Sequence, residues 1–312
     1  MIAFVFPGQG AQKVGMGHDL ANKYPLAAQT FAEVDAALGE PLCELCFHGP
    51  EEALRQTRNT QPALVGTSVA AYRLVSQVVS PSFVAGHSLG EYTALVAAGS
   101  LSLTDAVRVV RKRGLLMEAA VPKGTGTMAA IIGLDANQAE DICQVASECG
   151  MVAPATYNGG GQIVVAGEVA AVNTAIELAL KAGARRVQHL NVSGPFHTKL
   201  MRCAAEQLQQ ILLDIHLANA TIPVYANASA TALYKPDDIR KALVSQVYSP
   251  VRWEECVHAM WGDGARIFIE IGPGRVLSGL IKRIIPEAQV FNVSDAMGLE
   301  NIIVHLKGGG VK

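Results

Sequence analysis

The sequence predicts an α/β protein in which helices cover both faces of a parallel β-sheet and a smaller unit is inserted into the chain. Two observations support this fold class. Short apolar strand candidates alternate with helical patterns in the first and last thirds of the 312 residues. Between these parts, the candidates follow the order β-α-β-β-α-β, which is typical of a ferredoxin-like unit. Half of the residues are hydrophobic, which is enough for a deep core.

The N-terminal part begins with the apolar run IAFVF, which ends at Pro7-Gly8 and predicts a buried strand leading into a loop. Ser102 or Thr104 is expected to cap the last helix of this part. The predicted elements are a strand at 2–6, a helix at 62–79, a strand at 82–85, a helix at 91–98 and a helix through Val107–Leu116.

The central part predicts the inserted unit. Its glycine-rich segment 158–161 is expected to close a hairpin, and Gly183 to end a helix. The predicted elements are strands at 127–134, 151–157, 162–167 and 186–192, with helices at 135–148 and 169–183.

The C-terminal part returns to alternating elements and ends in a glycine-rich stretch that is expected to form a loose tail. Segment 272–275 is expected to be a strand-to-helix turn, because it lacks the spacing and lysine of a phosphate-binding loop. The predicted elements are helices at 199–213, 237–247, 253–261 and 275–284, strands at 222–226, 266–271 and 289–293, and a short terminal helix. The predicted domains are a discontinuous large one (1–125 and 195–312) and a small one (126–194).

Composition excludes several classes of function. A formal net charge of −2 does not favour binding to nucleic acid, which needs a concentrated basic face. The N-terminus lacks the features of a secretory signal, and no segment reaches the roughly 18 apolar residues of a membrane helix. We therefore expect a cytoplasmic protein that binds no membrane. Cys43 and Cys46 form a C-x-x-C motif near His48, but no second ligand pair follows, so buried thiols are expected rather than a metal site.

The strongest chemical signal is the G-x-S-x-G sequence at Gly86–Gly90, between a predicted strand and a predicted helix. A nucleophilic serine needs a sharp turn that exposes its hydroxyl, and glycines permit that turn. The amides of the following helix can stabilise an oxyanion. These requirements favour Ser88 as a nucleophile over an ordinary turn.

A serine hydroxyl needs a base, and eight histidines are available. His87 is adjacent to Ser88, so a tight turn is expected to point its side chain elsewhere. His197 lies in a loop before a helix, where a base can reach a neighbouring turn. Spacing alone places it only slightly ahead of His216 and His258, which lie in helical stretches.

A resemblance to a known family distinguishes these alternatives. The chain contains, in order, FPGQGAQ at 6–12, GHSLGEY at 86–92, RG at 113–114, GPFH at 194–197 and QVYSPVRW at 246–253. Together these motifs resemble the malonyl-CoA:acyl carrier protein transacylases of bacterial fatty-acid synthesis, over about residues 2–305. The resemblance implies an α/β-hydrolase-like large domain with a ferredoxin-like insertion.

The same resemblance implies roles for individual residues. It makes Ser88 the nucleophile and His197 the general acid and base. No Asp or Glu between them is a clear third member of a triad. The family instead orients the histidine with a backbone carbonyl, which gives Gln246 a positioning role. The backbone N–H groups of Gln9 and Leu89 would form the oxyanion hole.

Two further residues concern the substrate. Arg113 would bind the malonyl carboxylate through its planar guanidinium, whereas Arg108 and Arg111 fit solvated cations better. Phe196 before the histidine is associated with malonyl rather than methylmalonyl substrates. Asn158 would lie near the mouth of the site without a catalytic role.

The expected reaction moves a malonyl group from malonyl-CoA to the phosphopantetheine thiol of an acyl carrier protein through a malonyl-serine. No permanently bound cofactor or metal is expected, and a monomer is expected. Two alternatives remain: loading of polyketide synthase carrier proteins, and hydrolysis by a serine hydrolase or thioesterase.

Overall fold

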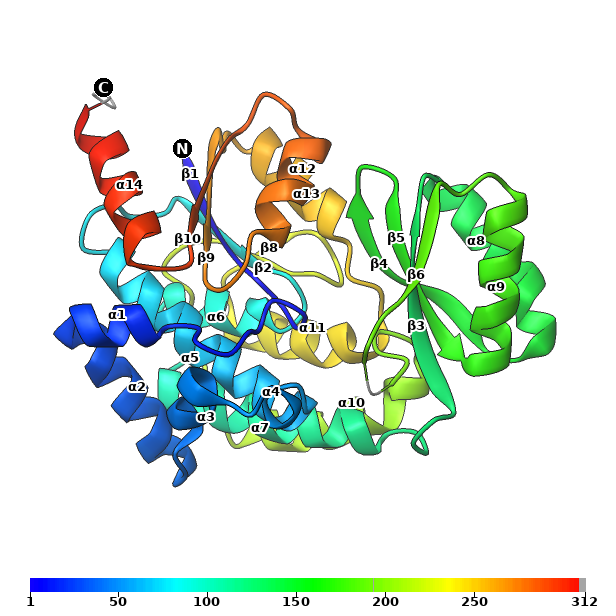
Figure 1. The fold of residues 1–312 in the computed structure, drawn as a ribbon, viewed down its shortest axis with the longest axis horizontal. Helices are drawn as coiled ribbons and strands as arrows, with labels where there is room; N and C mark the ends of the chain where they lie inside the picture. The colour runs from blue at the N-terminus through cyan, green and yellow to red at the C-terminus, as the bar shows by residue number, and fades with distance from the viewer. Residues whose placement is uncertain (193, 309–312) are drawn as a thin grey trace.

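The computed structural model describes residues 1–192 and 194–308 and contains two separate sheets (Figure 1). The large sheet is parallel except for its last strand, which pairs antiparallel with its neighbour. Its strand order is β10 (Gln289–Val293), β9 (Ile267–Ile271), β1 (Ile2–Phe6), β2 (Phe83–Gly86), β7 (Val224–Tyr225) and β8 (Ala232–Leu233). The predicted α/β fold class is confirmed.

Helices cover both faces of this sheet, and strand β1 shows why its sequence is apolar throughout. Phe4 and Phe6 face one hydrophobic cluster, whereas Ala3 and Val5 face another, because successive side chains of a strand alternate. The helices of the large unit are α1 (His18–Lys23), α2 (Pro25–Leu38), α3 (Leu42–His48), α4 (Glu51–Leu54), α5 (Thr57–Val75), α6 (Gly90–Ala97), α7 (Leu103–Ala119), α10 (Arg202–Leu213), α11 (Pro236–Tyr248), α12 (Trp253–Gly262), α13 (Val276–Ile284) and α14 (Ala296–Gly308).

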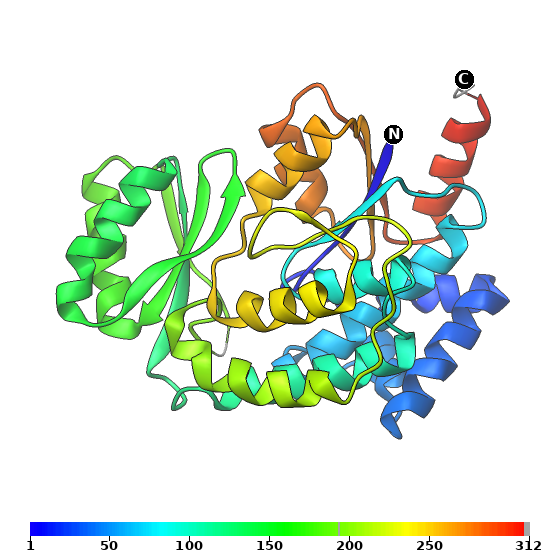
Figure 2. The same cartoon turned by 180° about the vertical axis from the view of Figure 1, so that it is seen from behind.

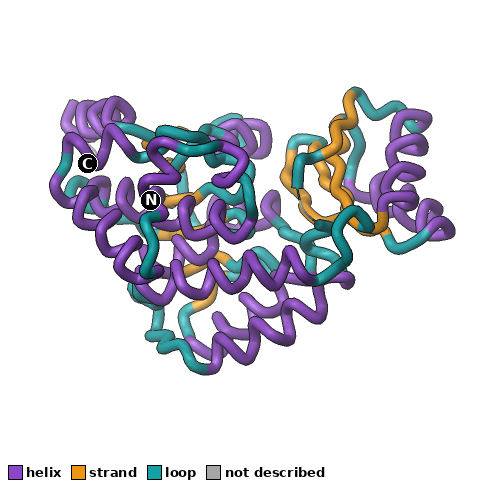
Figure 3. The backbone as a smooth tube through the Cα atoms, turned by 60° about the horizontal axis from the view of Figure 1, so that its bottom comes forward, coloured by secondary structure: helices purple, strands orange, loops and turns teal. Residues whose placement is uncertain are grey.

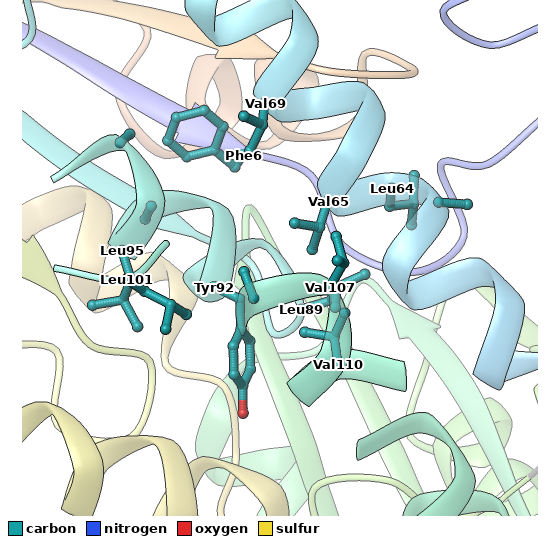
Figure 4. Close-up of a cluster of buried hydrophobic side chains, with 14 of the residues drawn as sticks. Phe6, Leu64, Val65, Val69, Leu89, Tyr92, Leu95, Leu101, Val107 and Val110 are labelled. Carbon is teal, nitrogen blue, oxygen red and sulfur yellow. The ribbon is translucent and has the colours of Figure 1, made fainter. Parts of the chain in front are cut away.

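The larger cluster anchors helix α6, which directly follows the predicted nucleophile. Leu89 and Tyr92 pack beside Val65 of α5 and Val107 and Val110 of α7 (Figure 4). All five side chains are buried, and burying a side chain of this size contributes roughly 1.5–3 kcal/mol. The helix that carries the site is therefore held by the core on the side away from solvent.

The small sheet is antiparallel and has the strand order of a ferredoxin-like fold. It consists of β4 (Val152–Gly159), β5 (Gln162–Glu168), β3 (Gly126–Ile132) and β6 (Arg186–His189), in that order. Helices α8 (Ala136–Ala146) and α9 (Val169–Lys181) pack on one face of it through a separate hydrophobic cluster. Both strand groups are visible in Figure 3, and Figure 2 shows the small unit standing beside the large one.

Hydrogen bonds and close packing join the two units. Tyr157 N donates to Val251 O at 2.9 Å, and Val251 N donates to Ala155 O at 2.9 Å, so one strand of the small sheet is attached to the large unit. A Cβ on Gly126 would lie 2.4 Å from Pro195 Cδ, so the two crossing segments touch. We propose that the boundaries between the two domains lie at 125/126 and 194/195.

Most predicted elements are present with shifted ends. Ser102 caps α7 by accepting a hydrogen bond from Asp105 N at 3.0 Å. Segment 272–275 forms the turn between β9 and α13, and 158–161 lies at the β4–β5 hairpin. The predicted helix at 199–213 begins with a 3-10 turn at Lys199–Met201, and the helix at 135–148 also ends in one, at Ser147–Cys149.

The sequence analysis missed helices α1–α4 and strand β8. Helices α1, α3 and α4 are short, and Gly or Pro residues separate the four helices, so the periodicity of this part of the chain is weak. The predicted strand at 186–192 ends at His189, and the expected C-terminal tail lies mostly outside the described residues.

Candidate active site

Ser88 lies on a strained turn between β2 and α6. Its φ is 50°, in the left-handed region that is unusual for a residue with a side chain. The flanking glycines make the turn possible: a Cβ on Gly86 would lie 1.8 Å from Gly90 C, and a Cβ on Gly90 would lie 2.1 Å from Phe6 O. The turn therefore has the geometry predicted for a nucleophile.

Asn227, from the loop after β7, holds this turn in place. Its Oδ1 accepts from Ser88 N at 2.6 Å, and its Nδ2 donates to Gly86 O at 2.7 Å. The side chain is fully buried. Such residues stabilise a strained backbone, and nothing in the local sequence distinguished this asparagine from a loop residue.

His197 is the histidine that reaches Ser88. Its Nε2 lies 2.7 Å from Ser88 Oγ, and its Nδ1 lies 2.8 Å from the backbone oxygen of Gln246. A carbonyl oxygen can only accept, so Nδ1 carries the proton and Nε2 is free to accept the serine proton. The tautomer required of a general base is therefore fixed by the backbone of α11.

The environment keeps this imidazole neutral. His197 is buried, and burial together with the positive field of Arg113 lowers its pKa to about 3, against the opposing hydrogen bond to Gln246. A neutral imidazole can act as a base at neutral pH. His216 and His258, the other candidates, are exposed on the surface.

Arg113 projects from α7 into the same site and is 1% exposed. Its Nη2 lies 3.3 Å from Ser88 Oγ and donates to Gln246 Oε1 at 2.9 Å, while Nη1 donates to Gln61 Oε1 at 3.0 Å. Its Nε has no hydrogen-bond partner among the described residues. A buried guanidinium with a spare donor next to a nucleophile can bind a carboxylate.

Helix packing places Arg113 at this depth. A Cβ on Gly114 would lie 2.9 Å from both Arg58 Cα and Thr57 O, so the glycine allows α7 to lie directly against the start of α5. The guanidinium then stacks over the ring of Tyr92, with Cζ 5.6 Å from the ring centroid. Arg111, expected to be solvated, instead pairs with Asn59 and Glu40.

Gln246 connects three parts of the site. Besides its contacts with His197 and Arg113, its Nε2 donates to Ser88 O and to Glu91 Oε2, both at 2.9 Å. Glu91 was not identified from the sequence. It is 2% exposed, and burial raises its pKa to about 7, against the lowering effects of its hydrogen bonds and of Arg113.

The loops after β1 and β2 lie side by side, because Phe6 pairs with Gly86 in parallel register. A Cβ on Gly8 would lie 2.4 Å from His87 O, so the Gln9 loop closely approaches the serine turn. Leu89 is the N-cap of α6, where amides lack intrahelical acceptors. Within the described chain, neither the backbone N–H of Gln9 nor that of Leu89 donates to a protein acceptor.

These groups open onto one pocket of about 250 Å³ between the two units. Ser88, His197, Arg113, Gln9 and Phe196 all line it, together with residues of β3, β5 and α13. Phe196 is 6% exposed, so its ring forms part of the pocket wall. Ser88, His197 and Arg113, the residues expected to be nucleophile, base and carboxylate-binding cation, thus line the same pocket.

Comparisons with known proteins agree with this arrangement. The family model for the acyl transferase domain matches residues 3–300. The chain belongs to the acyl transferase family. Within it, curated proteins named malonyl CoA-acyl carrier protein transacylase are similar over nearly the whole chain. The Bacillus subtilis protein is 46% identical, covering 98% of this chain and 97% of its own, and the Escherichia coli K12 protein is 47% identical, covering 95% and 97%.

Solved structures of this acyltransferase family are equally similar. An acyl carrier protein S-malonyltransferase from Vibrio cholerae superposes with a TM-score of 0.94 at 45% identity, covering 96% of this chain and 99% of its own. A malonyl-transacylase in complex with a type II polyketide acyl carrier protein gives 0.95 at 44% identity, with 99% of each chain covered. The chain is therefore an acyltransferase of the malonyl-CoA:acyl carrier protein transacylase type.

His87 of this acyltransferase points away from Ser88, as expected. Its Nε2 lies 2.8 Å from Asn158 Oδ1 on β4, and its ring lies beside Trp253. Burial lowers the pKa of His87. The residue thus connects the serine turn to the small sheet, and Asn158 lines the pocket as expected.

The described residues contain no group of three or more His, Cys, Asp or Glu placed to hold a metal ion. Cys43 and Cys46 are buried thiols, and burial raises the pKa of Cys46 to about 12. His48 is exposed beside Glu44. None of the described helices is both long and apolar enough to cross a membrane.

Proposed function

We propose that the protein transfers a malonyl group from malonyl-CoA to the phosphopantetheine thiol of holo-acyl carrier protein through a malonyl ester on Ser88. One observation carries the proposal: Ser88 Oγ lies 2.7 Å from His197 Nε2 and 3.3 Å from Arg113 Nη2 within one pocket. A nucleophile, a base and a carboxylate-binding cation therefore lie close enough together to act on the same small acyl group.

In the first half-reaction, Ser88 Oγ attacks the thioester carbonyl of malonyl-CoA while His197 Nε2 takes the hydroxyl proton. The carbonyl oxygen becomes an oxyanion that accepts from the Gln9 and Leu89 amides. Collapse breaks the C–S bond, and the imidazolium returns its proton to the departing CoA thiolate. The products are free CoA and malonyl-Ser88.

The second half-reaction reverses these steps with a different thiol. His197 takes the proton of the phosphopantetheine thiol, whose sulfur attacks the ester carbonyl. The ester C–O bond breaks, and Ser88 Oγ regains the proton. The malonyl carboxylate stays paired with Arg113 throughout, which holds the acyl group in register for both attacks.

Phe196 contributes selectivity in this proposal. Its buried ring adjoins the base and lines the pocket, where it would crowd an α-methyl substituent on the acyl group. Malonyl would therefore be preferred to methylmalonyl.

Two other acceptors are the competing readings. The similar transacylase in complex with a polyketide carrier protein supports a polyketide acceptor as the second candidate. Water as acceptor would make the protein a hydrolase. Arg113 disfavours a general esterase because an uncharged acyl group would leave the buried cation without an anionic partner on the substrate. We further propose a cytoplasmic monomer that supplies fatty-acid elongation.

The test follows labelled malonyl-CoA with purified protein and either a fatty-acid holo-carrier protein, a polyketide holo-carrier protein, or buffer alone. The proposal expects label on the fatty-acid carrier at a rate well above release of free malonate. Faster loading of the polyketide carrier would favour the second candidate, and equal malonate release in all three reactions would contradict transfer.

A further inference from the structure

Glu91 is a buried carboxylate next to the catalytic groups that the mechanism above does not use. It lies on the first turn of α6, three residues after Ser88, and its side chain is almost completely buried. Carboxylates are rarely buried unless they are paired or hydrogen-bonded, because their desolvation is costly. A carboxylate at this depth in a catalytic unit therefore calls for a role.

The contacts of Glu91 lead directly to the base. Glu91 Oε2 accepts from Gln246 Nε2 and from Asn227 N, both at 2.9 Å. The backbone oxygen of Gln246 in turn accepts from His197 Nδ1 at 2.8 Å. A single residue thus separates the carboxylate from the imidazole. In a serine triad, the carboxylate contacts the histidine directly and stabilises the imidazolium that forms during acyl transfer.

The same contacts lead to the cation that faces the acyl group. Gln246 Oε1 accepts from Arg113 Nη2 at 2.9 Å, and Gln246 Nε2 bridges Ser88 O and Glu91. The amide of Gln246 has a defined orientation because two acceptors, Ser88 O and Glu91, lie on its nitrogen side and a donor, Arg113, lies on its oxygen side. If the amide rotated by 180°, its N–H would face a guanidinium.

We propose that Glu91 is a positioning residue for the transfer reaction: as a carboxylate it fixes Gln246 between His197 and Arg113 and stabilises the imidazolium at one remove. It thereby supplies the negative charge that a triad carboxylate supplies elsewhere. The proposal rests on the proposed function, since it concerns proton transfer from Ser88 to His197. No other reactant is needed, because this step only moves a proton from Ser88 to His197.

The charge state of Glu91 then controls activity. The titratable groups that face it are Arg113 on α7, Tyr92 beside it on α6 and Cys256 on α12. Burial raises the pKa of both Tyr92 and Cys256, so both are neutral near pH 7 and Arg113 is the charged neighbour. The pKa of Glu91 is raised to about 7 and that of His197 is lowered to about 3. Protonation of Glu91, and not of His197, should therefore limit acylation as the pH falls through about 7.

The test compares three substitutions by rapid quench of Ser88 malonylation across the pH range. Glu91→Gln keeps an oxygen that can accept from Asn227 and Gln246 but removes the charge. Glu91→Asp keeps the charge and shortens the side chain. Glu270→Gln is the matched control. Glu270 is equally buried, but it accepts hydrogen bonds from the backbone N–H groups of Leu277 and Ser278 at the start of α13 instead of contacting Gln246.

We expect Glu91→Gln to lower kcat about tenfold above pH 8, to change KM for malonyl-CoA by less than about threefold, and to remove the acid limb near pH 7. Glu91→Asp should retain the limb and recover part of the rate. Glu270→Gln should lower the melting temperature but keep the limb with its wild-type midpoint.

A limb that persists in Glu91→Gln with its wild-type midpoint would overturn the proposal. The acylation rate of Glu91→Gln can also be divided by the fraction of chains that form malonyl-Ser88. If this corrected rate equals the wild-type rate, Glu91 has a purely structural role and the proposal is overturned. If Glu91→Gln does not fold, the Glu270→Gln protein still permits a decision, because it retains Glu91 but lacks the buried carboxyl of Glu270. The infrared band of its protonated buried carboxyl should titrate with the same midpoint as the acylation rate. Different midpoints would refute the coupling. No malonylation of Ser88 in the wild-type protein would instead contradict the proposed function itself.

Discussion

The backbone oxygen of Gln246 accepts a hydrogen bond from His197 Nδ1 at 2.8 Å, which orients the base without a carboxylate in contact with it. Gln246 lies in the last turn of α11 (Pro236–Tyr248), where carbonyl oxygens have no intrahelical donor. The negative end of the helix dipole also lies there and favours a neighbouring cation. A helix end therefore fixes the tautomer of His197 and favours the imidazolium that it forms.

Ser88→Ala tests the covalent step. Removal of Oγ leaves His197 without its partner and the malonyl group without an attacking atom, so no malonyl ester should form. Peptide mass spectrometry after incubation with malonyl-CoA should find the ester on Ser88 of the wild-type protein and nowhere on the variant. An ester or thioester on a cysteine in either protein would contradict the two-step route.

His197→Ala tests the base. General acid–base catalysis contributes roughly two to four orders of magnitude, so acylation should slow by that factor. The pKa of His197 is lowered to about 3, so its imidazole is neutral throughout the neutral pH range. Imidazole added to the His197→Ala variant should act as a base in its place and restore part of the rate. Single-turnover acylation measures both effects. A variant with near wild-type rates would point to His87, whose Nε2 contacts Asn158 instead of Ser88.

The fold class and the serine turn could be predicted because local signals define them, whereas His197 and Arg113 were selected through the family resemblance. The run IAFVF is apolar throughout because both of its faces are buried. Glycine is required on either side of Ser88 because an added Cβ would lie less than 2.5 Å from backbone atoms. Asn227 and Glu91 could not be found in this way. Their roles depend on partners that are 136 to 155 residues apart in the chain. Helices α1, α3 and α4 were missed because short helices depend on packing more than on periodicity, and the longer helix α2 between them was missed with them.

Gly90→Ala tests the backbone contact that shapes the serine turn. A Cβ at this position would lie 2.1 Å from Phe6 O and 2.9 Å from Pro7 O, both backbone atoms that cannot move aside without displacing β1. The free energy of unfolding should fall by about 3 kcal/mol or more, measured by urea denaturation. Gly262→Ala is the control, because nothing lies within 4 Å of its Cβ at the end of α12. Its stability should change by less than about 1 kcal/mol. Equal losses in both variants would contradict the role of the Phe6 contact, because Gly262 has no such contact and alanine favours the helix more than glycine does.

Arg113→Ala tests how the acyl group is selected. A charge-assisted hydrogen bond contributes about 1.5–3 kcal/mol, and one between Arg113 and the malonyl carboxylate would be present in both half-reactions. Malonyl transfer should therefore fall at least about tenfold to a hundredfold in kcat/KM, at about 1.4 kcal/mol per factor of ten. Acetyl-CoA has no carboxylate, so its transfer should persist or rise once the buried cation is removed. Arg113→Lys should recover little, because an ammonium cannot donate to Gln61, Gln246 and a carboxylate in one plane. The measurement is kcat/KM for malonyl-CoA and acetyl-CoA in the wild-type protein and both variants. Arg113 also holds Gln246, so a lesser loss on acetyl-CoA would report on that contact. Equal losses on both substrates would mean that Arg113 only supports the site, and its assignment to the carboxylate would be withdrawn.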